Sequence, residues 1–321
     1  MRRNNKMKKI FQKQAYMPKK DNSEQLFISH LPAHVATVRD YYNKSTKWYQ
    51  RLWYDKKSLG IHYGFWESST KKREEALIEQ YKIVKELINP KKGQVILDAG
   101  CGVGGASLWL AEHTEAQYTG ITISDDQIIR AKQFLQSRNL SNRVKFLKRD
   151  YFNTKFKDKQ FDKIFLIESG CYAYPHPLSL YQEMYRILKI GGILVISDGV
   201  YLRKPQGEEE EIMHKEYCEG FKLIDMCTPE EIIKNLSGAN FKNISHIDKT
   251  KEIKKSMEEV DKYVKLGKML QFSKYIGLAT QVETDNILAI KNQKRLYNLG
   301  IFGYGIFCAK RSKECTSDSL P

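Results

Sequence analysis

The feature that most constrains the fold is the stretch from Val95 to Gly105, in which apolar residues lead into an acid and then a glycine cluster. Three apolar positions precede Asp98, the glycines follow in a G-x-G-x-G pattern, and residues 106–112 have a helical composition. The pattern predicts a strand, a tight turn and a helix, because glycine lets a backbone pass close to a ligand without a side chain in the way. It differs from the G-x-G-x-x-G dinucleotide fingerprint. By itself the pattern also fits a tight turn that binds nothing.

Segments with strand and helix character alternate after this turn. Ser124 and Thr228 precede two of the expected helices as N-caps. The alternation predicts an α/β fold with a doubly wound, seven-stranded, mostly parallel sheet and helices on both faces. Gly191 and Gly192 are expected to form a turn before the fifth strand. We expect helices at 71–89, 124–138, 178–188 and 229–237, and strands at 94–98, 117–123, 143–147, 161–167, 193–197, 241–247 and 303–309.

Composition limits the function classes. The 321 residues carry a net charge of +16, but the basic residues are scattered and no nucleic-acid motif accompanies them. We therefore expect no nucleic-acid partner, and an RNA-modifying enzyme remains an alternative that only the charge suggests.

The six cysteines form no C-x-x-C pair, which argues against a zinc site or a disulfide framework. No stretch approaches the roughly 20 apolar residues of a membrane span, and the basic N-terminus lacks the apolar segment of a secretory signal. We expect a cytoplasmic protein without stable membrane insertion.

Four motifs follow one another along the expected strands. They are Asp98 to Gly104 (D-A-G-C-G-V-G), Gly120 to Gln127 (G-I-T-I-S-D-D-Q), Arg149 to Tyr151 (R-D-Y) and Arg186 to Gly192 (R-I-L-K-I-G-G). In this order they resemble the class I S-adenosylmethionine-dependent methyltransferases, and the second motif is similar to that of the cyclopropane-synthase and sterol-methyltransferase branch. The resemblance implies a Rossmann-like methyltransferase sheet. It also implies that Thr122 and Gln127 hold the cofactor ribose in place of an acid, and that Asp150 accepts from the adenine amine. The cofactor contacts that it implies are Tyr63, Asp98, Gly100, Cys101, Gly102, Thr122, Gln127, Asp150, Tyr151 and Glu168.

The end of the fourth expected strand bears on the reaction. Residues 167–172 read I-E-S-G-C-Y and lack the Asn/Asp-Pro-Pro-Tyr motif of many N-methyltransferases. They resemble the I-E-x-x-C-H of sterol C-methyltransferases, with Tyr172 in place of the histidine, and also the E-S-x-x-Y of prenyl diphosphate C-methyltransferases. Tocopherol-type C-methyltransferases share E-S-G. We therefore expect methyl transfer to carbon of a small apolar acceptor, an isoprenoid alkene of prenyl diphosphate or sterol type.

Carbon methylation gives these residues a chemical role. An alkene that attacks a methyl group becomes a carbocation, which a nearby carboxylate stabilises and deprotonates while aromatic faces cradle the charge. We expect Glu168 to be that base, with Tyr172 beside it and His62 as either a second base or a hydrogen-bonding wedge. The loop from His62 to Trp66 resembles the segment that closes over the cofactor in this branch. The expected acceptor-binding residues are Tyr63, Phe65, Trp66, Tyr172 and Tyr174.

The domain organisation follows from these assignments. We expect a flexible basic tail (1–24), an N-terminal helical cap with the cofactor-closing loop (25–93), an S-adenosylmethionine-binding core (94–248), a helical lid inserted between strands six and seven (249–298), the last core strand (299–311) and a flexible tail (312–321). No protein metal site is expected, and Mg²⁺ enters only if the acceptor is a diphosphate. A homo-oligomer is left open. The alternatives are O- or N-methylation of a small metabolite, with Glu168 or His62 as base, and a binding protein without turnover.

Overall fold

The computed structural model describes residues 23–52, 57–259 and 281–312. It has two compact units, residues 1–38 and 39–321. The described residues of the first unit belong to helix α2 (Ser23–Leu52), whose residues from Arg39 onward belong to the second unit. The flexible tails expected over 1–24 and 312–321 lie almost entirely outside the described residues, and α2 already begins at Ser23.

The centre of the second unit is one sheet of seven strands among the described residues, in the order β3-β2-β1-β4-β5-β7-β6. The first five strands run parallel, and β7 is antiparallel to both β5 and β6. The predicted fold class is confirmed. The strand order reverses between β1 and β4, which is where open α/β sheets bind ligands at the carboxyl ends of their strands. The strands are β1 (Val95–Ala99), β2 (Gln117–Thr122), β3 (Val144–Lys148), β4 (Phe161–Ile167), β5 (Leu188–Tyr201), β6 (Lys242–Asp248) and β7 (Phe302–Lys310).

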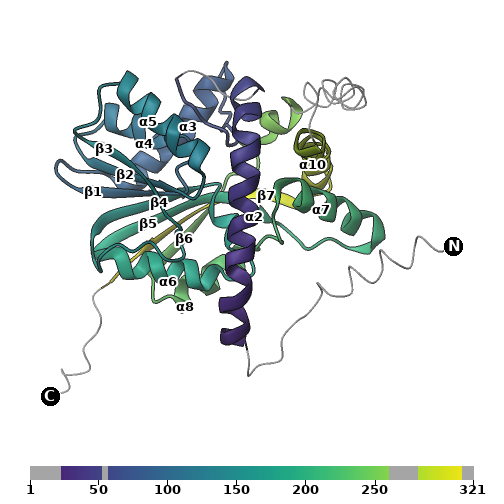
Figure 1. Cartoon of the computed structure of the whole chain (residues 1–321). Coiled ribbons are helices and arrows are strands. Elements are labelled where there is room, and N and C mark those ends of the chain that lie inside the picture. The colour runs from purple at the N-terminus through teal and green to yellow at the C-terminus, as the bar shows by residue number, and fades with distance from the viewer. Residues whose placement is uncertain (1–22, 53–56, 260–280, 313–321) are drawn as a thin grey trace. The chain divides into compact units, whose positions relative to one another are not determined.

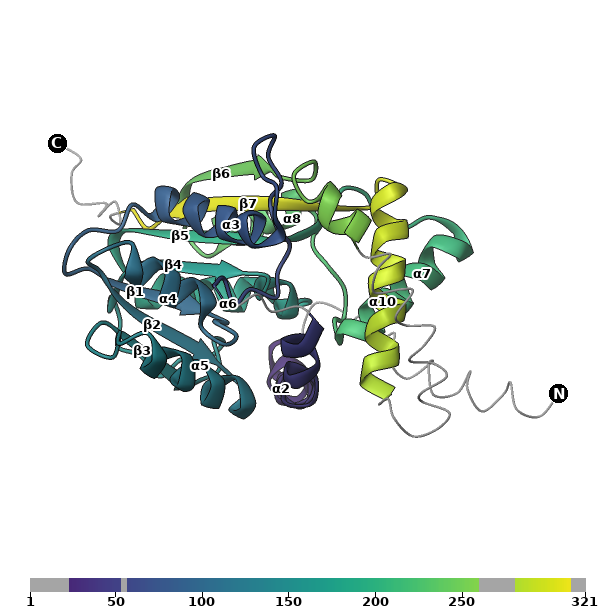
Figure 2. The ribbon, with the colours of Figure 1, turned by 90° about the horizontal axis from the view of Figure 1, so that it is seen from above.

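Helices cover both faces of the sheet (Figures 1 and 2). Helices α3 (Arg73–Ile88), α4 (Gly105–Glu112) and α5 (Asp125–Ser137) pack on one face, and α6 (Pro177–Ile187) and α8 (Pro229–Gly238) pack on the other. The predicted caps are present. Ser124 accepts a hydrogen bond from the Gln127 backbone, and Thr228 forms a capping box with Glu231.

Two further helices stand outside this sandwich and pack against each other, namely α7 (Gly207–Phe221) and α10 (Gln281–Asn298). The ring of Tyr217 on α7 lies 5.9 Å from the ring of Phe302, which places α7 by the carboxyl end of β5. Helical structure was predicted between β6 and β7, and α10 and residues 254–259 are helical there. Residues 260–280 of the predicted lid lie outside the described residues. No helix in the described ranges is long and apolar enough to span a bilayer.

The prediction of a turn at Gly191 and Gly192 was wrong. Strand β5 begins at Leu188 and runs through both glycines. Its pairing with β4 passes from Leu188 opposite Phe161 to Ile193 opposite Lys163, so residues 189–192 stand against a single residue of β4. Gly191 has a φ of +79°. The glycines therefore form a bulge that bends the strand without ending it.

The main hydrophobic core lies between the sheet and helices α6 and α8. Its strand residues come from adjacent, near-continuous apolar runs, as expected for parallel strands that are covered on both faces. Burial of these side chains holds the carboxyl ends of β1, β4 and β5 at one edge. Members of this core include Leu97, Ala99, Ile164, Leu166, Leu180, Met184, Leu194, Ile196, Leu236 and Phe307.

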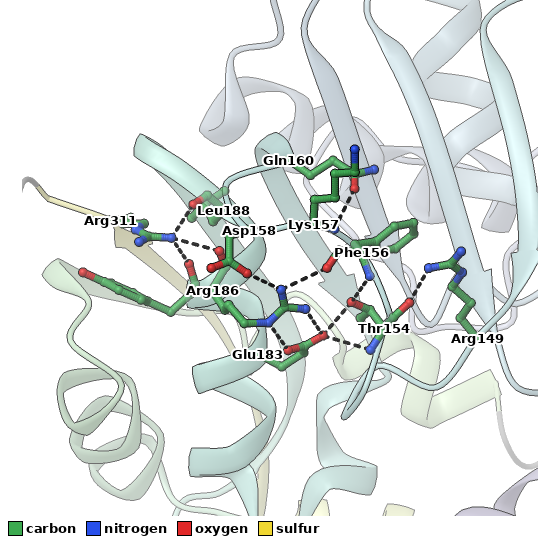
Figure 3. A network of polar contacts seen from close by, with 11 residues as sticks. Arg149, Thr154, Phe156, Lys157, Asp158, Gln160, Glu183, Arg186, Leu188 and Arg311 are labelled. Carbon is green, nitrogen blue, oxygen red and sulfur yellow. Dashed lines mark hydrogen bonds and ion pairs between the residues drawn. The ribbon is translucent and has the colours of Figure 1, made fainter.

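A polar network ties the opposite, amino-terminal edge together (Figure 3). Arg311, which follows β7, is 6% exposed, and one of its guanidinium nitrogens donates to the carbonyls of Tyr185, Arg186 and Leu188 at 2.5, 3.1 and 2.7 Å. Arg186 in turn forms an ion pair with Glu183 at 2.8 Å. The network fixes the end of α6 against the beginning of β5 without approaching the other edge of the sheet.

Replacement of Arg311 by methionine is expected to lower the free energy of unfolding by about 3 kcal/mol, because one buried and two partly buried carbonyls lose a charged donor. Equilibrium urea denaturation measures this change. Lys310→Met is the matched control, since Lys310 is exposed and its loss should cost no more than about 0.5 kcal/mol. Equal effects of the two replacements would contradict a structural role for the Arg311 contacts.

Candidate functional site

The turn between β1 and α4 contains three glycines with positive φ, and their surroundings differ. A Cβ atom on Gly100 (φ +89°) would lie 2.3 Å from the Cβ of Ser169, and one on Gly104 (φ +88°) would lie 2.3 Å from the ring of Phe146. A Cβ atom on Gly102 (φ +55°) would have no atom within 4 Å. The protein therefore packs tightly against two of the glycines and leaves open space in front of Gly102.

The acid before this turn faces the following helix. Asp98 is 2% exposed, and Ser107 of α4 donates to its carboxylate at 2.7 Å. Burial raises the pKa of Asp98 to about 7, and the Ser107 hydrogen bonds oppose that rise. The backbone N–H groups of Gly100 and Cys101 both donate to the Ile121 carbonyl at 2.9 Å. The carboxyl ends of β1 and β2 are thus joined at the glycine turn.

The residues predicted to hold ribose and adenine lie at the ends of β2 and β3. The Thr122 hydroxyl donates to the Gln127 amide oxygen at 2.6 Å, and both side chains are buried. The Asp150 carboxylate accepts from the Phe152 backbone at 2.9 Å, and burial raises its pKa. Tyr151 reaches across to β4, where its hydroxyl donates to the Ser169 carbonyl at 3.0 Å. All of these residues are on the carboxyl edge that also carries Gly102.

Glu168 follows β4 in a left-handed conformation, with a φ of +47°. Its residue is only partly buried, and one carboxylate oxygen, Oε1, accepts from the Tyr63 backbone N–H at 2.8 Å and from the Tyr304 hydroxyl at 2.9 Å. Burial raises the pKa of Glu168 to about 8, the negative charge of Asp198 adds to the rise, and the two hydrogen bonds oppose it. A carboxyl group that titrates near neutral pH is suited to proton transfer.

Asp198, at the carboxyl end of β5, holds the turn that follows Glu168. Its carboxylate accepts from the Cys171 backbone at 2.9 Å and from the Gly199 backbone at 2.9 Å. Burial raises the pKa of Asp198 to about 6. The contact with Cys171 anchors the short helix η1 (Gly170–Ala173), which carries Tyr172.

Tyr172, on the short helix that follows Glu168, contacts a tyrosine of α2. The Tyr42 hydroxyl of α2 donates to the Tyr172 hydroxyl at 2.9 Å, and the Tyr172 hydroxyl donates to the Phe221 carbonyl at 3.1 Å. The rings of Tyr42 and Tyr172 meet edge to face, with centroids 5.8 Å apart. The ring of Tyr63 lies 5.9 Å from that of Tyr304. Glu168 therefore has the Tyr63 backbone and the Tyr304 hydroxyl as direct partners, and Tyr42 of α2 lies near enough to interact with its charge.

His62 contacts the backbone of Tyr63, the residue whose N–H donates to Glu168. Its Nδ1 lies 2.8 Å from the Tyr63 carbonyl oxygen, which can only accept, so Nδ1 carries the ring proton. The ring is 8% exposed and packs on Tyr81, and burial lowers its pKa to about 4. Of the two roles left open for His62, the geometry fits the wedge that holds Tyr63.

The other expected acceptor-binding residues contact side chains other than Glu168. Phe65 is 0% exposed and packs on the Tyr304 ring, so it helps to hold that ring in place. The indole N–H of Trp66 donates to Ser256 at 3.0 Å, and its ring lies under Lys255. Tyr174 lies 5.8 Å from the Lys204 ammonium, on the side of β5. These three residues make no hydrogen bond or ring contact with Glu168 among the described residues.

Sequence reasoning missed Tyr304, Gln80 and Asp198. Tyr304 stands between two glycines in the last strand, and Asp198 directly follows the strand predicted at 193–197, so the sequence around each residue marked it as unusual. Gln80 had no signal, because it lies on a helix that reads as an ordinary amphipathic segment. Across the described ranges, no group of three or more acidic, histidine or cysteine side chains is placed to hold a metal ion.

A family model described as a methyltransferase domain matches residues 90–261, more than half of the chain. A sterol 24-C-methyltransferase of Gibberella zeae is 31% identical over 223 residues, which cover 67% of this chain and 56% of that enzyme. The chain spans about half the length of the curated relatives it matches.

Solved structures share the fold. The cyclase SpnF superposes with a TM-score of 0.71 at 24% identity, over 86% of this chain and 95% of that one. A geranyl diphosphate C-methyltransferase from Streptomyces coelicolor, in complex with Mg²⁺, geranyl diphosphate and S-adenosylhomocysteine, superposes with a TM-score of 0.64 at 17% identity, over 87% and 97% of the two chains. Because a cyclase and a methyltransferase share this fold, the reaction has to be argued from the site.

Proposed function

Because the chain belongs to the methyltransferase domain family, we propose that it transfers a methyl group from S-adenosylmethionine to carbon of a small apolar acceptor, an isoprenoid alkene of sterol or prenyl type. The observation that carries the proposal is Glu168, a partly exposed residue whose carboxyl group has a raised pKa and accepts hydrogen bonds from the Tyr63 backbone and the Tyr304 hydroxyl. It lies at the carboxyl end of β4, beside the point where the strand order reverses.

The glycine turn is suited to the cofactor. The open space in front of Gly102 admits a ligand close to the backbone, while the tight packing at Gly100 and Gly104 holds the turn in shape. In this proposal Thr122 and Gln127 bind the ribose, and Asp150 and Tyr151 flank the adenine. When bound, the cofactor supplies a methyl group on a positively charged sulfur atom.

Glu168 then acts on the acceptor. When the alkene π electrons form the new carbon–carbon bond, the methyl–sulfur bond breaks with its electron pair on sulfur, and the positive charge passes to the acceptor. The carboxylate of Glu168 takes a proton from the neighbouring carbon, and the electrons of that C–H bond form the new double bond. The faces of Tyr63 and Tyr172 stabilise the charge while it lasts, by about 0.5–2 kcal/mol each. The tyrosine wall also excludes water, which would otherwise capture the cation.

The similar proteins support this choice of acceptor. One is a sterol 24-C-methyltransferase and another a geranyl diphosphate C-methyltransferase, so both transfer methyl groups to carbon of isoprenoids by name. Magnesium enters the proposal only if the acceptor carries a diphosphate, since the ion then binds together with the substrate. A cytoplasmic location remains part of the proposal.

Product analysis tests the reaction. The protein is incubated with methyl-¹³C-labelled S-adenosylmethionine and, separately, a sterol, a prenyl diphosphate, a phenol and an amine. Mass spectrometry detects the added methyl group and NMR locates it. A label on carbon of one isoprenoid is expected, whereas a label only on oxygen or nitrogen would replace carbon methylation with the O- or N-methyltransferase alternative. Absence of calorimetric binding of S-adenosylhomocysteine would refute the enzyme assignment.

The pH dependence follows from the same carboxyl group. Only the ionised form of Glu168 can accept a proton, and its pKa in the ligand-free protein is about 8. We expect kcat/KM to rise about tenfold per pH unit from pH 6 toward pH 8 and then to level off. The profile of kcat should level off at lower pH, because the positive charge of the bound cofactor favours the carboxylate. A kcat/KM that is flat across this interval would exclude Glu168 as the base.

A further inference from the structure

The two oxygens of the Glu168 carboxyl group have different surroundings. Oε1 accepts two hydrogen bonds, from the Tyr63 backbone and the Tyr304 hydroxyl. For Oε2, the described part of the chain provides no hydrogen bond. Oε2 is not among the fully buried polar atoms that lack a partner, so in this partly exposed residue it faces open space. A carboxylate held in this way has one anchored oxygen and one that is available to a ligand.

Gln80 of α3 determines the direction of the Tyr304 hydroxyl. The Gln80 amide nitrogen donates to the Tyr304 oxygen at 2.6 Å and to the Ser197 hydroxyl at 2.8 Å. A phenol has a single proton to donate. Since the amide already donates to the phenol oxygen, that proton is directed to Glu168. Gln80 and Tyr304 are both fully buried, so water does not compete for these hydrogen bonds.

We propose that Tyr304, directed by Gln80, is a positioning residue for the reaction: together with the Tyr63 N–H it holds Oε1 of Glu168 and so presents Oε2 as the oxygen that takes the acceptor proton. This inference rests on the proposed function. Tyr304 does not touch the acceptor in this scheme and acts only through Glu168.

Other groups that face Glu168 do not replace Tyr304. Asp198 approaches from β5, Cys171 from η1, and Tyr42 and Tyr49 from α2. Their ionised forms are all negative, so they can only disfavour the carboxylate. Tyr304 is the side chain that donates to it among the described residues, and its hydrogen bond lowers the pKa of Glu168. Its removal should therefore raise that pKa.

An NMR titration of the ligand-free protein tests the inference directly. Glutamate is labelled with ¹³C at the side-chain carboxyl, and the Glu168 signal is identified by its loss in Glu168→Gln. In Tyr304→Phe we expect the Glu168 titration midpoint to rise by about one pH unit, and the kcat/KM profile to move by the same amount. The dissociation constant of S-adenosylhomocysteine, measured by calorimetry, should stay within about twofold of the wild-type value, because the hydroxyl that Tyr304→Phe removes bonds to Glu168, Gln80 and Ser197, and the ring stays in place.

Two variants make the result specific. Tyr118→Phe removes a buried phenol hydroxyl on β2 that bonds to Thr114, so it should leave the Glu168 midpoint unchanged. Gln80→Leu keeps the Tyr304 hydroxyl but removes its direction, so it should shift the midpoint in the same sense and by less. This second variant also decides the question if Tyr304→Phe does not fold.

The outcomes separate this inference from the proposed function. Equal Glu168 midpoints in wild type, Tyr304→Phe and Gln80→Leu would overturn it. A loss of activity in Tyr304→Phe with an unchanged midpoint would also overturn it, since the tyrosine would then act on the acceptor itself. If the midpoint shifts as expected but wild type methylates none of the acceptors, the positioning of Glu168 stands and the proposed function fails.

Discussion

Replacement of Glu168 by glutamine is expected to lower kcat for carbon methylation by at least about a hundredfold, the usual contribution of a general base. The amide oxygen of glutamine can still accept from the Tyr63 backbone and the Tyr304 hydroxyl, so the site keeps its shape. What it loses is the ability to take a proton from the acceptor. The rate of methylated product formation, measured at saturating cofactor, gives the effect.

Two controls accompany this replacement. Binding of S-adenosylhomocysteine should change little, because the lost function is proton transfer. Stability provides the second control. The pKa of Glu168 is about 8 in the folded protein, against 4.5 for an ordinary glutamate, so the folded state binds more protons between these values. Wild type should therefore lose stability relative to Glu168→Gln as the pH rises from 5 to 8. Carbon methylation at the wild-type rate in this variant would remove Glu168 from the mechanism.

Replacement of Gly102 by alanine is expected to weaken cofactor binding by at least about tenfold while the protein stays folded. A Cβ atom at this position meets no protein atom within 4 Å, so it projects into the space that we assign to the cofactor. The φ of +55° costs an alanine about 1–2 kcal/mol. Calorimetric titration with S-adenosylhomocysteine measures the loss of affinity, and urea denaturation measures the loss of stability.

Alanine variants of two other glycines serve as controls for Gly102→Ala. Gly93 has a φ of +78° and also has no atom within 4 Å of a built Cβ, but it precedes β1 at the opposite edge of the sheet. Gly93→Ala should therefore show a similar loss of stability with unchanged cofactor affinity. Gly100→Ala should lose roughly 3 kcal/mol or more, because strain adds to a clash with Ser169. Equal affinities of Gly102→Ala and Gly93→Ala would place the cofactor elsewhere.

Most of the fold could be predicted because its signals are local. The alternation of apolar runs with capped helices located the strands to within a residue or two at most ends, and β4 coincides with its predicted bounds. The start of β5 was the main error. Two consecutive glycines are typical of a turn, and whether they end a strand or form a bulge depends on the register with β4, which is a non-local property.

The candidate site could be predicted only in part. Thr122, Asp150 and Glu168 were singled out because the motifs at the ends of the second, third and fourth strands resemble those of class I methyltransferases, and parallel strands bring these ends to one edge. Their assigned roles stay predictions. His62 was recognised as special but its two roles could not be separated, since the choice depends on which atoms surround the ring.

The sequence by itself determined where strands end, where helices begin and which residue follows β4, because spacing, caps and glycines act over a few neighbouring positions. Only the tertiary structure decided what surrounds Glu168. Tyr63 and Tyr304 reach its carboxylate from 105 and 136 residues away, and Gln80 reaches Tyr304 from a third element. Burial and these distant donors set the pKa and the orientation of the carboxyl group, and neither can be deduced from the residues next to it.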